Sequence, residues 1–351
     1  MTDPSHLDGI NRVLVTKLRH HGDVLLASPV ISVLKRHLPE AEVDALVYRD
    51  TQDMLSEHPA LSHLHTIPRK ASLGEEWRLL NDLRRKNYDL LVHLTRNPRG
   101  AWMARLLKPR LAVGENYANK LYRNCFTHLF KRVHGHKRHT VENDLNALRC
   151  IGIRVNDEEK ELTLVPGIAA QQTAESLLKQ LNLKAGSYIL IHPTSRWMFK
   201  AWREEKVAML ADTLAASGLP LLFTSGPDVR EIEMLSRIQT RMTRPVPSLA
   251  GQLTLKQLAA LIAHARLFIG VDSAPMHMAA ALGTPVLALF GPSSDIDWGP
   301  WRVSSRVITS AHTCRPCLMA GCGDSRISDC LDSIPVDQVM EAAMELLGAP
   351  R

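Results

Sequence analysis

The 351-residue sequence lacks any apolar run that approaches the ~18 residues needed to span a bilayer. Residues 1–6 also lack the basic-then-apolar pattern of a signal peptide. These two absences predict a cytoplasmic protein. The chain has only six cysteines, and without an export signal they favour reduced thiols over a disulfide framework.

Three nucleotide-binding signatures are also absent. No Gly-x-Gly-x-x-Gly follows the first predicted strand, which argues against a dinucleotide oxidoreductase, and no Gly-x4-Gly-Lys-Ser/Thr occurs, which argues against a P-loop enzyme. No Asp-x-Asp pair stands directly after a predicted strand to hold a metal for a sugar diphosphate. Asp295 and Asp297 have that spacing in a later loop. We therefore expect no required cofactor and no metal site, with a weak magnesium contact at this loop left open.

The composition is that of a globular protein with more than one domain. Hydrophobic residues make up 45% and charged residues 23%, and the length exceeds that of a usual single domain. The net charge of +7 favours anionic partners such as nucleotides, phosphorylated glycolipid or an acidic membrane. Nucleic acid is also anionic, so the charge alone does not select the partner.

Strand-like apolar runs alternate with amphipathic helical stretches, which predicts parallel α/β sheets. In the first half we expect strands over 13–15, 42–47 and 88–93, a helix up to about Leu38, an irregular basic stretch over 114–140 and a helix over 140–150. Ser28-Pro29 predicts either a kink or a new helix with Ser28 as the N-cap. We place the domain boundary at 165/166, within ten residues.

The alternation restarts beyond Gly186. We expect strands over 188–191, 221–224, 267–270 and 286–290, and helices after Arg203, after Asp228, from Thr254, over 274–282 and over 336–347. The closing helix is placed in the second domain, with its return to the first domain as an alternative. Two α/β halves favour a ligand cleft between them, outside the carboxyl ends of parallel strands.

The stretch 268–277 predicts an anion site. A strand ends at Gly270, Asp272 and Ser273 occupy the turn, and a helix follows from Ala274. Free N–H groups and the positive end of the helix dipole then point at a bound anion, with His277 one turn further. The alternative is that Asp272 or Ser273 simply caps the helix.

The stretch 191–202 follows the end of another predicted strand and contains Thr194, Ser195, Arg196 and Lys200. Hydroxyls can donate to a diphosphate, and a lysine offers a compact positive charge against the leaving group. The alternative is a solvated loop whose Trp202 packs on the surface.

The stretch 17–24 ends the first strand, and Gly22 allows close backbone approach there. Asp23 lies at the mouth of the first sheet, where a carboxylate could accept a proton from a sugar hydroxyl. The alternative is that Asp23 caps the next helix.

Two residue clusters allow a binding or a structural interpretation. Four late cysteines could bind zinc, although their spacing differs from paired knuckles and favours buried or redox-active thiols: Cys314, Cys317, Cys322 and Cys330. A basic run in the first half is either a solvated face or a surface for a phosphorylated acceptor: Arg96, Arg99, Arg105, Lys108, Arg110, Arg123, Lys131, Arg132, His134, His136, Lys137, Arg138 and His139.

The order and spacing of the three stretches resemble the ADP-heptose glycosyltransferases of lipopolysaccharide synthesis, glycosyltransferase family 9. The resemblance covers nearly the whole chain, including Cys-Arg-Pro-Cys at 314–317. Residues 17–31 resemble in particular the branch that adds the third heptose of the core. The resemblance implies an α/β GT-B fold with two facing Rossmann-like domains and a cleft between them, and an inverting single displacement.

The resemblance also implies roles for single residues. Asp23 matches the catalytic base and Lys200 a cation at the leaving phosphates, and Glu231 matches a ribose-binding carboxylate, although Asp228 fits nearly as well. The donor-binding residues it implies are Thr194, Ser195, Glu231, Leu253, Asp272, Ser273, Ala274 and His277. The acceptor-binding residues we expect are Arg19, Arg96 and Arg99. Asp272 would repel a diphosphate, so we expect it to orient Lys200 or His277 or to contact a sugar hydroxyl.

On this resemblance, residues 1–165 bind the acceptor and residues 166–351 bind the ADP-sugar. The expected reaction moves L-glycero-D-manno-heptose from ADP-heptose to the inner core, adding the branching third heptose to the second. The expected partners are ADP-heptose, a phosphorylated lipid A-Kdo-heptose acceptor and the inner face of the inner membrane, without nucleic acid. The alternatives are another core position, or a GT-B epimerase or transferase with a different donor; a zinc-bearing nucleic-acid binder is the rival from another class.

Overall fold

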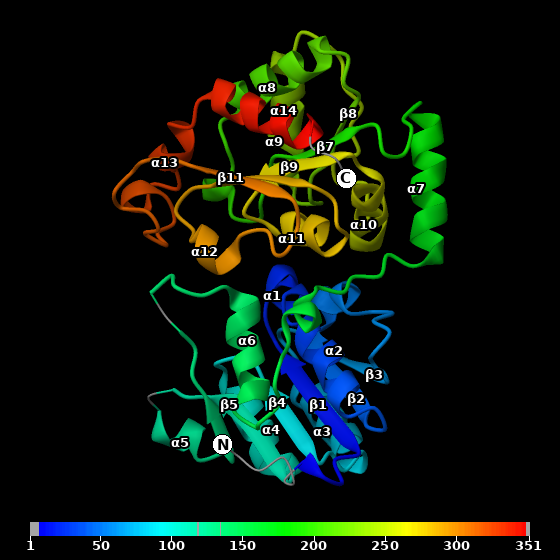
Figure 1. The fold of residues 1–351 in the computed structure, drawn as a ribbon, viewed down its shortest axis with the longest axis vertical. Coiled ribbons are helices and arrows are strands. Elements are labelled where there is room, and N and C mark those ends of the chain that lie inside the picture. The colour runs from blue at the N-terminus through cyan, green and yellow to red at the C-terminus, as the bar shows by residue number, and fades with distance from the viewer. Residues whose placement is uncertain (1–6, 118, 134, 349–351) are drawn as a thin grey trace. The chain divides into compact units, whose positions relative to one another are not determined.

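The computed structural model describes residues 7–117, 119–133 and 135–348, so 1–6 and His134 of the basic run lie outside the described residues. The chain divides into two compact units, Met1–Val165 and Pro166–Arg351. Each contains a parallel sheet flanked by helices, coloured blue to green and green to red in Figure 1. Within the described ranges, no helix combines the length and the apolar character needed to cross a bilayer.

The sheet of the first unit has the strand order β3-β2-β1-β4-β5-β6. Every described pairing in it is parallel; Val15, for example, lies opposite both Ala45 and Val92. The order reverses direction between β1 and β4, which makes this pair the switch point where ligands of such sheets bind. Its strands are β1 (Arg12–Lys17), β2 (Glu42–Tyr48), β3 (His63–Ile67), β4 (Leu90–His93), β5 (Leu111–Glu115) and β6 (His128–Phe130).

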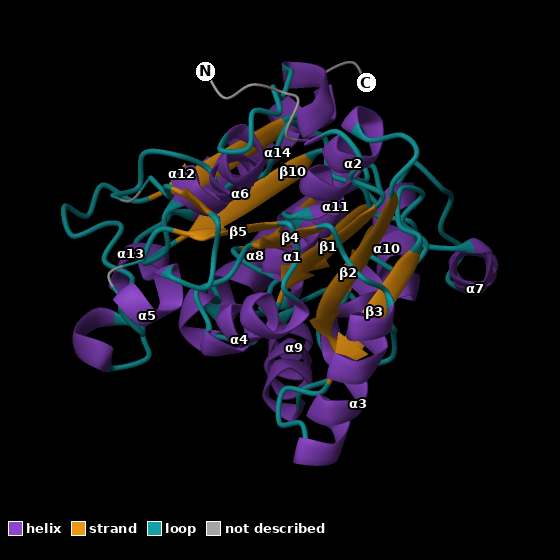
Figure 2. Cartoon of the chain, turned by 90° about the horizontal axis from the view of Figure 1, so that it is seen from below, coloured by secondary structure: helices purple, strands orange, loops and turns teal. Residues whose placement is uncertain are grey.

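Helices cover both faces of this sheet, as Figure 2 shows. On one face α2 (Ser28–His37) contacts α6 (Thr140–Arg149), and on the other α3 (Leu73–Arg85) contacts α4 (Pro98–Leu107). The α3/α4 face buries Leu14, Leu46 and Leu91 of the strands, because alternate strand residues point to the same side. The remaining short elements are α1 (His21–Leu25), η2 (Arg49–Met54), α5 (Lys120–Arg123) and η3 (Asp157–Lys160).

Ser28-Pro29 begins a new helix rather than kinking a longer one. The N-cap is Ala27 and not Ser28, so the predicted cap is wrong by one residue. Pro29 is accepted in the first turn because its missing N–H would have no helical partner there. The Ser28 hydroxyl accepts a hydrogen bond from the Thr163 N–H at 3.0 Å, which ties the end of the first unit to α2.

The sheet of the second unit has the order β11-β10-β9-β7-β8, again parallel in every described pairing. Its switch point lies between β9 and β7. The strands are β7 (Ile189–His192), β8 (Leu221–Phe223), β9 (Leu267–Val271), β10 (Val286–Phe290) and β11 (Ser305–Thr309).

One face of this second sheet is covered by α8 (Glu204–Ala216), α9 (Val229–Arg241) and α14 (Val336–Gly348), which share a core with β7 and β9. A second group comprises α10 (Leu255–His264), which contacts α7 (Ile168–Gln180) and α11 (Ala274–Ala281). The short elements are η4 (Met198–Lys200), α12 (Asp295–Trp298), η5 (Cys322–Asp324) and α13 (Asp329–Asp332).

The closing helix α14 packs on α8, β9, β10 and β11 of the second unit, because its apolar residues Val339, Ala343 and Leu347 are buried in the core of that unit. One expectation about the elements is wrong. The stretch 114–140 is not irregular throughout, since it contains α5 and β6. Its basic residues concealed the apolar Leu129 and Phe130, which complete a short edge strand.

Two histidines are buried at strand ends, and their burial leads us to expect that the protein loses stability in acid. Burial lowers the pKa of His192 to about 4, and burial and then Lys17 lower that of His93 to about 3. Unfolded histidine takes up a proton near pH 6.5, so the stability from the neutral folded form is full above that pH and falls below it. Each of these histidines should lower the free energy of unfolding by about 1.4 kcal/mol for each pH unit below about 6.5.

We expect urea unfolding midpoints to fall between pH 7.5 and 5.5. A His192→Asn variant should lose part of that pH dependence, although it is less stable at neutral pH. Equal midpoints for the parent protein at the two pH values would contradict this prediction.

Candidate functional site

Three loops with polar side chains leave the carboxyl edge of the second sheet. They follow β7, β8 and β9, and because β7 pairs with both β8 and β9, the three loops are neighbours. The switch point of the sheet lies among them. The structure therefore brings together the residues predicted to hold the donor: Thr194, Ser195, Lys200, Glu231, Asp272, Ser273, Ala274 and His277.

Lys200 and Asp272 form an ion pair across this edge. Lys200 Nζ lies 2.5 Å from Asp272 Oδ2, which joins η4 to the turn after β9. Asp272 is buried, whereas 22% of the Lys200 side chain stays exposed. An ammonium group has three N–H donors and this carboxylate oxygen engages one of them. Of the roles expected for Asp272, the geometry matches the orientation of Lys200.

The first turn of α11 starts directly beyond that pair. Ser273 occupies the N-cap position, but its hydroxyl makes no capping bond. Its Oγ is buried and has no hydrogen-bond partner among the described residues. The alternative in which Asp272 or Ser273 merely caps the helix is therefore wrong. The N–H groups of this turn and the Ser273 hydroxyl are suited to an anion, and His277 is buried one turn further on.

Glu231 links the loops after β7 and β8. Its Oε2 accepts hydrogen bonds from the Thr194 hydroxyl at 2.6 Å and from the Gly226 N–H at 3.2 Å. Asp228 instead caps α9 and binds Arg230, which lowers the pKa of Asp228 to about 2. Of these two carboxylates, only Glu231 is buried among the strand-end loops.

The loop after β7 is not a solvated segment. Trp202 is 2% exposed and lies in the core with α8, so the alternative that placed it on the surface is wrong. The Ser195 hydroxyl accepts the Trp197 N–H at 3.3 Å. Leu253 is half-buried, directly before the Thr254 cap of α10. The contacts of Trp202 and Ser195 hold the backbone of this loop in place, and with it the backbone of Lys200.

The metal alternatives find no support among the residues that the structure describes. No group of three or more His, Cys, Asp or Glu there could hold a metal ion. Asp295 pairs with Arg315, whose Nη2 lies 3.4 Å from Asp295 Oδ1. Cys314, Cys317, Cys322 and Cys330 are free thiols, and burial raises the pKa of Cys330.

Asp23 lies in the first turn of α1, beyond the carboxyl end of β1. It is inside the helix, whose N-cap is His20, so the capping alternative is wrong. Its side chain is 13% exposed, and Arg19 Nε lies 3.6 Å from its Oδ1. A carboxylate so placed at the switch point of the first sheet can accept a proton from a bound hydroxyl.

A buried ion network stands beside it and was missed from the sequence. Lys17 Nζ and Arg132 Nη2 each lie 2.6 Å from an oxygen of the fully buried Asp144. Arg132 also reaches Glu115, which accepts from Arg96. The network fixes the ends of β1 and β5. Its signals in the sequence were a lysine at the end of an apolar strand and two arginines of the basic run, Arg96 and Arg132, but the carboxylates Asp144 and Glu115 were missed.

The three arginines expected to bind the acceptor all follow strands at the carboxyl edge of the first sheet, and each has its own partner. Arg19 is half-exposed beside Asp23, and Arg96 binds Glu115 after the next strand. Arg99 pairs with Glu76 of α3, and its guanidinium lies 5.8 Å from the centre of the Tyr48 ring. Arg69 lies over the same ring and donates a hydrogen bond to the Arg19 carbonyl, so Arg99 is also close to Arg19. The structure thus places all three arginines at neighbouring strand ends of the first sheet, with Arg99 also at the edge of the α3/α4 surface.

Two parallel α/β units, each with polar loops at a switch point, are typical of the GT-B class of glycosyltransferases. A family model described as "Glycosyltransferase family 9 (heptosyltransferase)" matches residues 76–327. The chain belongs to glycosyltransferase family 9 and is a heptosyltransferase.

Relatives of known name support this assignment. "Lipopolysaccharide heptosyltransferase 3" of Escherichia coli is 39% identical over 293 residues, which cover 81% of this chain and 84% of the relative. A family 9 structure from Veillonella parvula matches with a TM-score of 0.82 and 24% identity over 97% of this chain and 98% of its own. The E. coli ADP-heptose heptosyltransferase II matches with a TM-score of 0.75 and 22% identity over 96% and 98%. These two likenesses confirm the fold.

Proposed function

We propose that the enzyme moves L-glycero-D-manno-heptose from ADP-heptose to the inner core of lipopolysaccharide, adding the branching third heptose to the second. The observation that carries this proposal is the Lys200–Asp272 pair beside the start of α11, a positively polarised site for a departing diphosphate. The relatives named lipopolysaccharide heptosyltransferase 3 support the core position. A family structure with ADP-2-deoxy-2-fluoro heptose supports the donor.

The second unit, residues 166–351, is proposed to bind the donor. Lys200, the Ser273 hydroxyl and the N–H groups from Ala274 would hold the phosphates. Glu231, held by Thr194, would accept hydrogen bonds from the ribose hydroxyls, and Leu253 would line the adenine pocket. Ser195 and His277 complete the donor set that we propose.

The first unit, residues 1–165, is proposed to bind the acceptor and supply the base. The acceptor hydroxyl oxygen attacks the anomeric carbon of the donor as its proton passes to a carboxylate oxygen of Asp23. A new C–O bond forms, the bond from the anomeric carbon to the β-phosphate oxygen breaks on the opposite face, and ADP departs with that electron pair. The configuration inverts, and no step is assigned to a metal.

The acceptor is proposed to be phosphorylated lipid A-Kdo-heptose, reached at the cytoplasmic face of the inner membrane. Arg19 and Arg96 would bind its anionic groups, since a guanidinium recognises phosphate and carboxylate through two parallel hydrogen bonds. Arg99, paired with Glu76, is the third cation assigned to the acceptor. The enzyme would therefore work in peripheral contact with that membrane.

The experiment that tests the proposal supplies purified enzyme with ADP-heptose and core acceptors truncated after the first, second or third heptose. We expect transfer only to the acceptor that ends at the second heptose, seen as a single added heptose by mass spectrometry. Core oligosaccharide from cells without the gene should lack the branching heptose. Turnover with a UDP-sugar alone, or sugar released without an acceptor, would contradict the donor or the reaction; addition elsewhere would contradict the position.

A further inference from the structure

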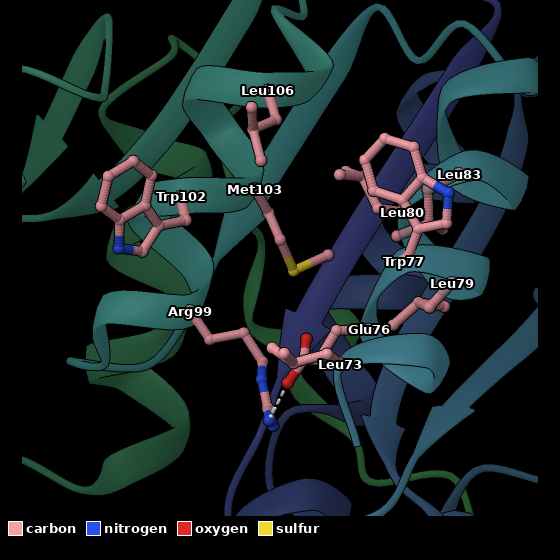
Figure 3. A pocket seen from close by; sticks show the side chains of 10 residues that line it. All are labelled: Leu73, Glu76, Trp77, Leu79, Leu80, Leu83, Arg99, Trp102, Met103 and Leu106. Atoms are coloured by element: carbon pink, nitrogen blue, oxygen red, sulfur yellow. Dashed lines mark hydrogen bonds and ion pairs between the residues drawn. The ribbon is translucent and has the colours of Figure 1, made fainter. Parts of the chain in front are cut away.

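An apolar groove runs between α3 and α4 on the outer surface of the first unit. It has a volume of about 650 Å³. Figure 3 shows Trp77 of α3 and Trp102 of α4 on opposite sides, with Met103 between them and the Arg99–Glu76 pair at one end. Leu73, Leu80 and Leu106 also line it.

The groove presents large apolar side chains to solvent. Leu73 is 90% exposed, Trp77 59% and Trp102 64%. Leu73, Trp77 and Leu80 recur at positions i, i+4 and i+7 and form a stripe along α3; Trp102 and Leu106 form its counterpart on α4. Contiguous exposed apolar surface with a polar border marks an interaction site rather than ordinary solvent exposure.

The two helices that form the groove carry a net positive charge. α3 and α4 together hold five arginines against three acidic residues, Glu75, Glu76 and Asp82, which gives the two helices a net charge of +2. Arg78, Arg84, Arg85 and Arg105 are exposed on the two helices themselves. A partner for this surface must therefore be apolar in its interior and anionic at its border.

We propose that the α3/α4 groove and its basic border form the surface by which the enzyme binds an anionic phospholipid bilayer. Tryptophan is favoured at the headgroup level, because its ring is apolar and its N–H can bond to water or phosphate. Exposed arginines on the same helices attract the negative leaflet at a range of one Debye length. The two helices would lie in the interface with Leu73, Trp77, Trp102 and Leu106 inserted, as amphipathic helices do.

This inference rests on the proposed function for its purpose, because a lipid-linked acceptor requires contact with a membrane. It adds the surface that makes the contact, which neither the family assignment nor the donor site specifies. Its test can be separated from the reaction, because vesicle binding is measured without donor or acceptor.

The test uses the full chain and vesicles of phosphatidylcholine with or without about 30% phosphatidylglycerol. This fraction of anionic lipid is similar to that of an anionic leaflet. We expect cosedimentation with the anionic vesicles, weakening as salt rises. Trp77→Ala with Trp102→Ala should lower the partition coefficient at least about tenfold. Arg84→Gln with Arg105→Gln should lower it about fivefold per charge at low salt.

Control variants remove exposed apolar surface or charge elsewhere. Ile168→Ala with Met209→Ala truncates two exposed apolar side chains of the second unit, and Lys179→Gln with Arg244→Gln removes two exposed cations there. Both should bind vesicles as the parent does. Control pairs that weaken binding as much as the groove pairs would overturn the proposal.

A second measurement does not depend on variants that lose apolar surface. Brominated acyl chains should quench part of the intrinsic fluorescence of the parent, and the conservative pair Trp77→Phe with Trp102→Phe should remove that quenching while vesicle binding persists. Transfer to a delipidated core oligosaccharide should be unchanged in all the groove variants. Unchanged quenching in the phenylalanine pair, or a dimer in solution that the alanine pair abolishes, would overturn the bilayer proposal. Loss of transfer to the delipidated acceptor in the parent would instead count against the proposed function.

Discussion

Replacing Asp23 with alanine is expected to abolish heptosyl transfer while leaving ADP-heptose binding nearly intact. A general base contributes about 10²- to 10⁴-fold, and without it the acceptor hydroxyl must attack while still protonated. Asp23 lies in the first unit, whereas the residues proposed to hold ADP follow β7, β8 and β9 in the second. The loss should therefore fall on kcat, with the dissociation constant for ADP-heptose from calorimetry almost unchanged.

The isosteric Asp23→Asn variant separates the loss of the base from the loss of packing. It keeps the shape of a side chain that is 13% exposed, so both variants should be equally inactive. Asp53→Asn serves as the matched control, because it removes a carboxylate from η2, which packs against α1. Retained turnover in either Asp23 variant would move the base to another residue.

The fold was predictable wherever apolar periodicity was strong. Residues 286–290 form a strand with the predicted bounds, because all five side chains are buried in a central strand. β3 was missed since its sequence, His-Leu-His-Thr-Ile, shows few apolar residues. Polar residues such as His65 would be expected at the surface. In the structure His65 is buried in β3, because its Nε2 lies 3.3 Å from the Asp44 carboxylate of β2.

The donor residues could be brought together from the sequence, but the sequence could not select which of the expected roles Asp272 has, among them the orientation of Lys200. Parallel strands place their carboxyl ends on one edge, so Thr194 and Asp272 were expected to be neighbours. That Asp272 binds Lys200 depends on side-chain geometry across 72 residues of sequence. The Lys17–Asp144 pair spans 127 residues, and the α3/α4 groove depends on how two helices pack. Local patterns carry no information on such contacts.

Replacing Lys200 with alanine is expected to cut the rate several-hundred-fold, about 3–4 kcal/mol of lost stabilisation of the departing charge. The reason is that charge grows on the leaving β-phosphate oxygen as the bond to the anomeric carbon breaks. An ammonium held by Asp272 needs no reorganisation at that moment. Steady-state kcat with saturating donor is the measurement, and a loss below tenfold would contradict the phosphate role.

A double-mutant cycle with Asp272→Asn distinguishes orientation from a direct contact with the sugar. If Asp272 acts only by positioning the ammonium, its removal should cost much less in a Lys200→Ala background than in the parent, because the group that it orients is already gone. Additive losses would mean that Asp272 contacts the donor by itself. Lys206→Ala is the control lysine: its Nζ donates to the Asp332 and Ile334 carbonyls, so its loss should lower stability and leave kcat near the parent value.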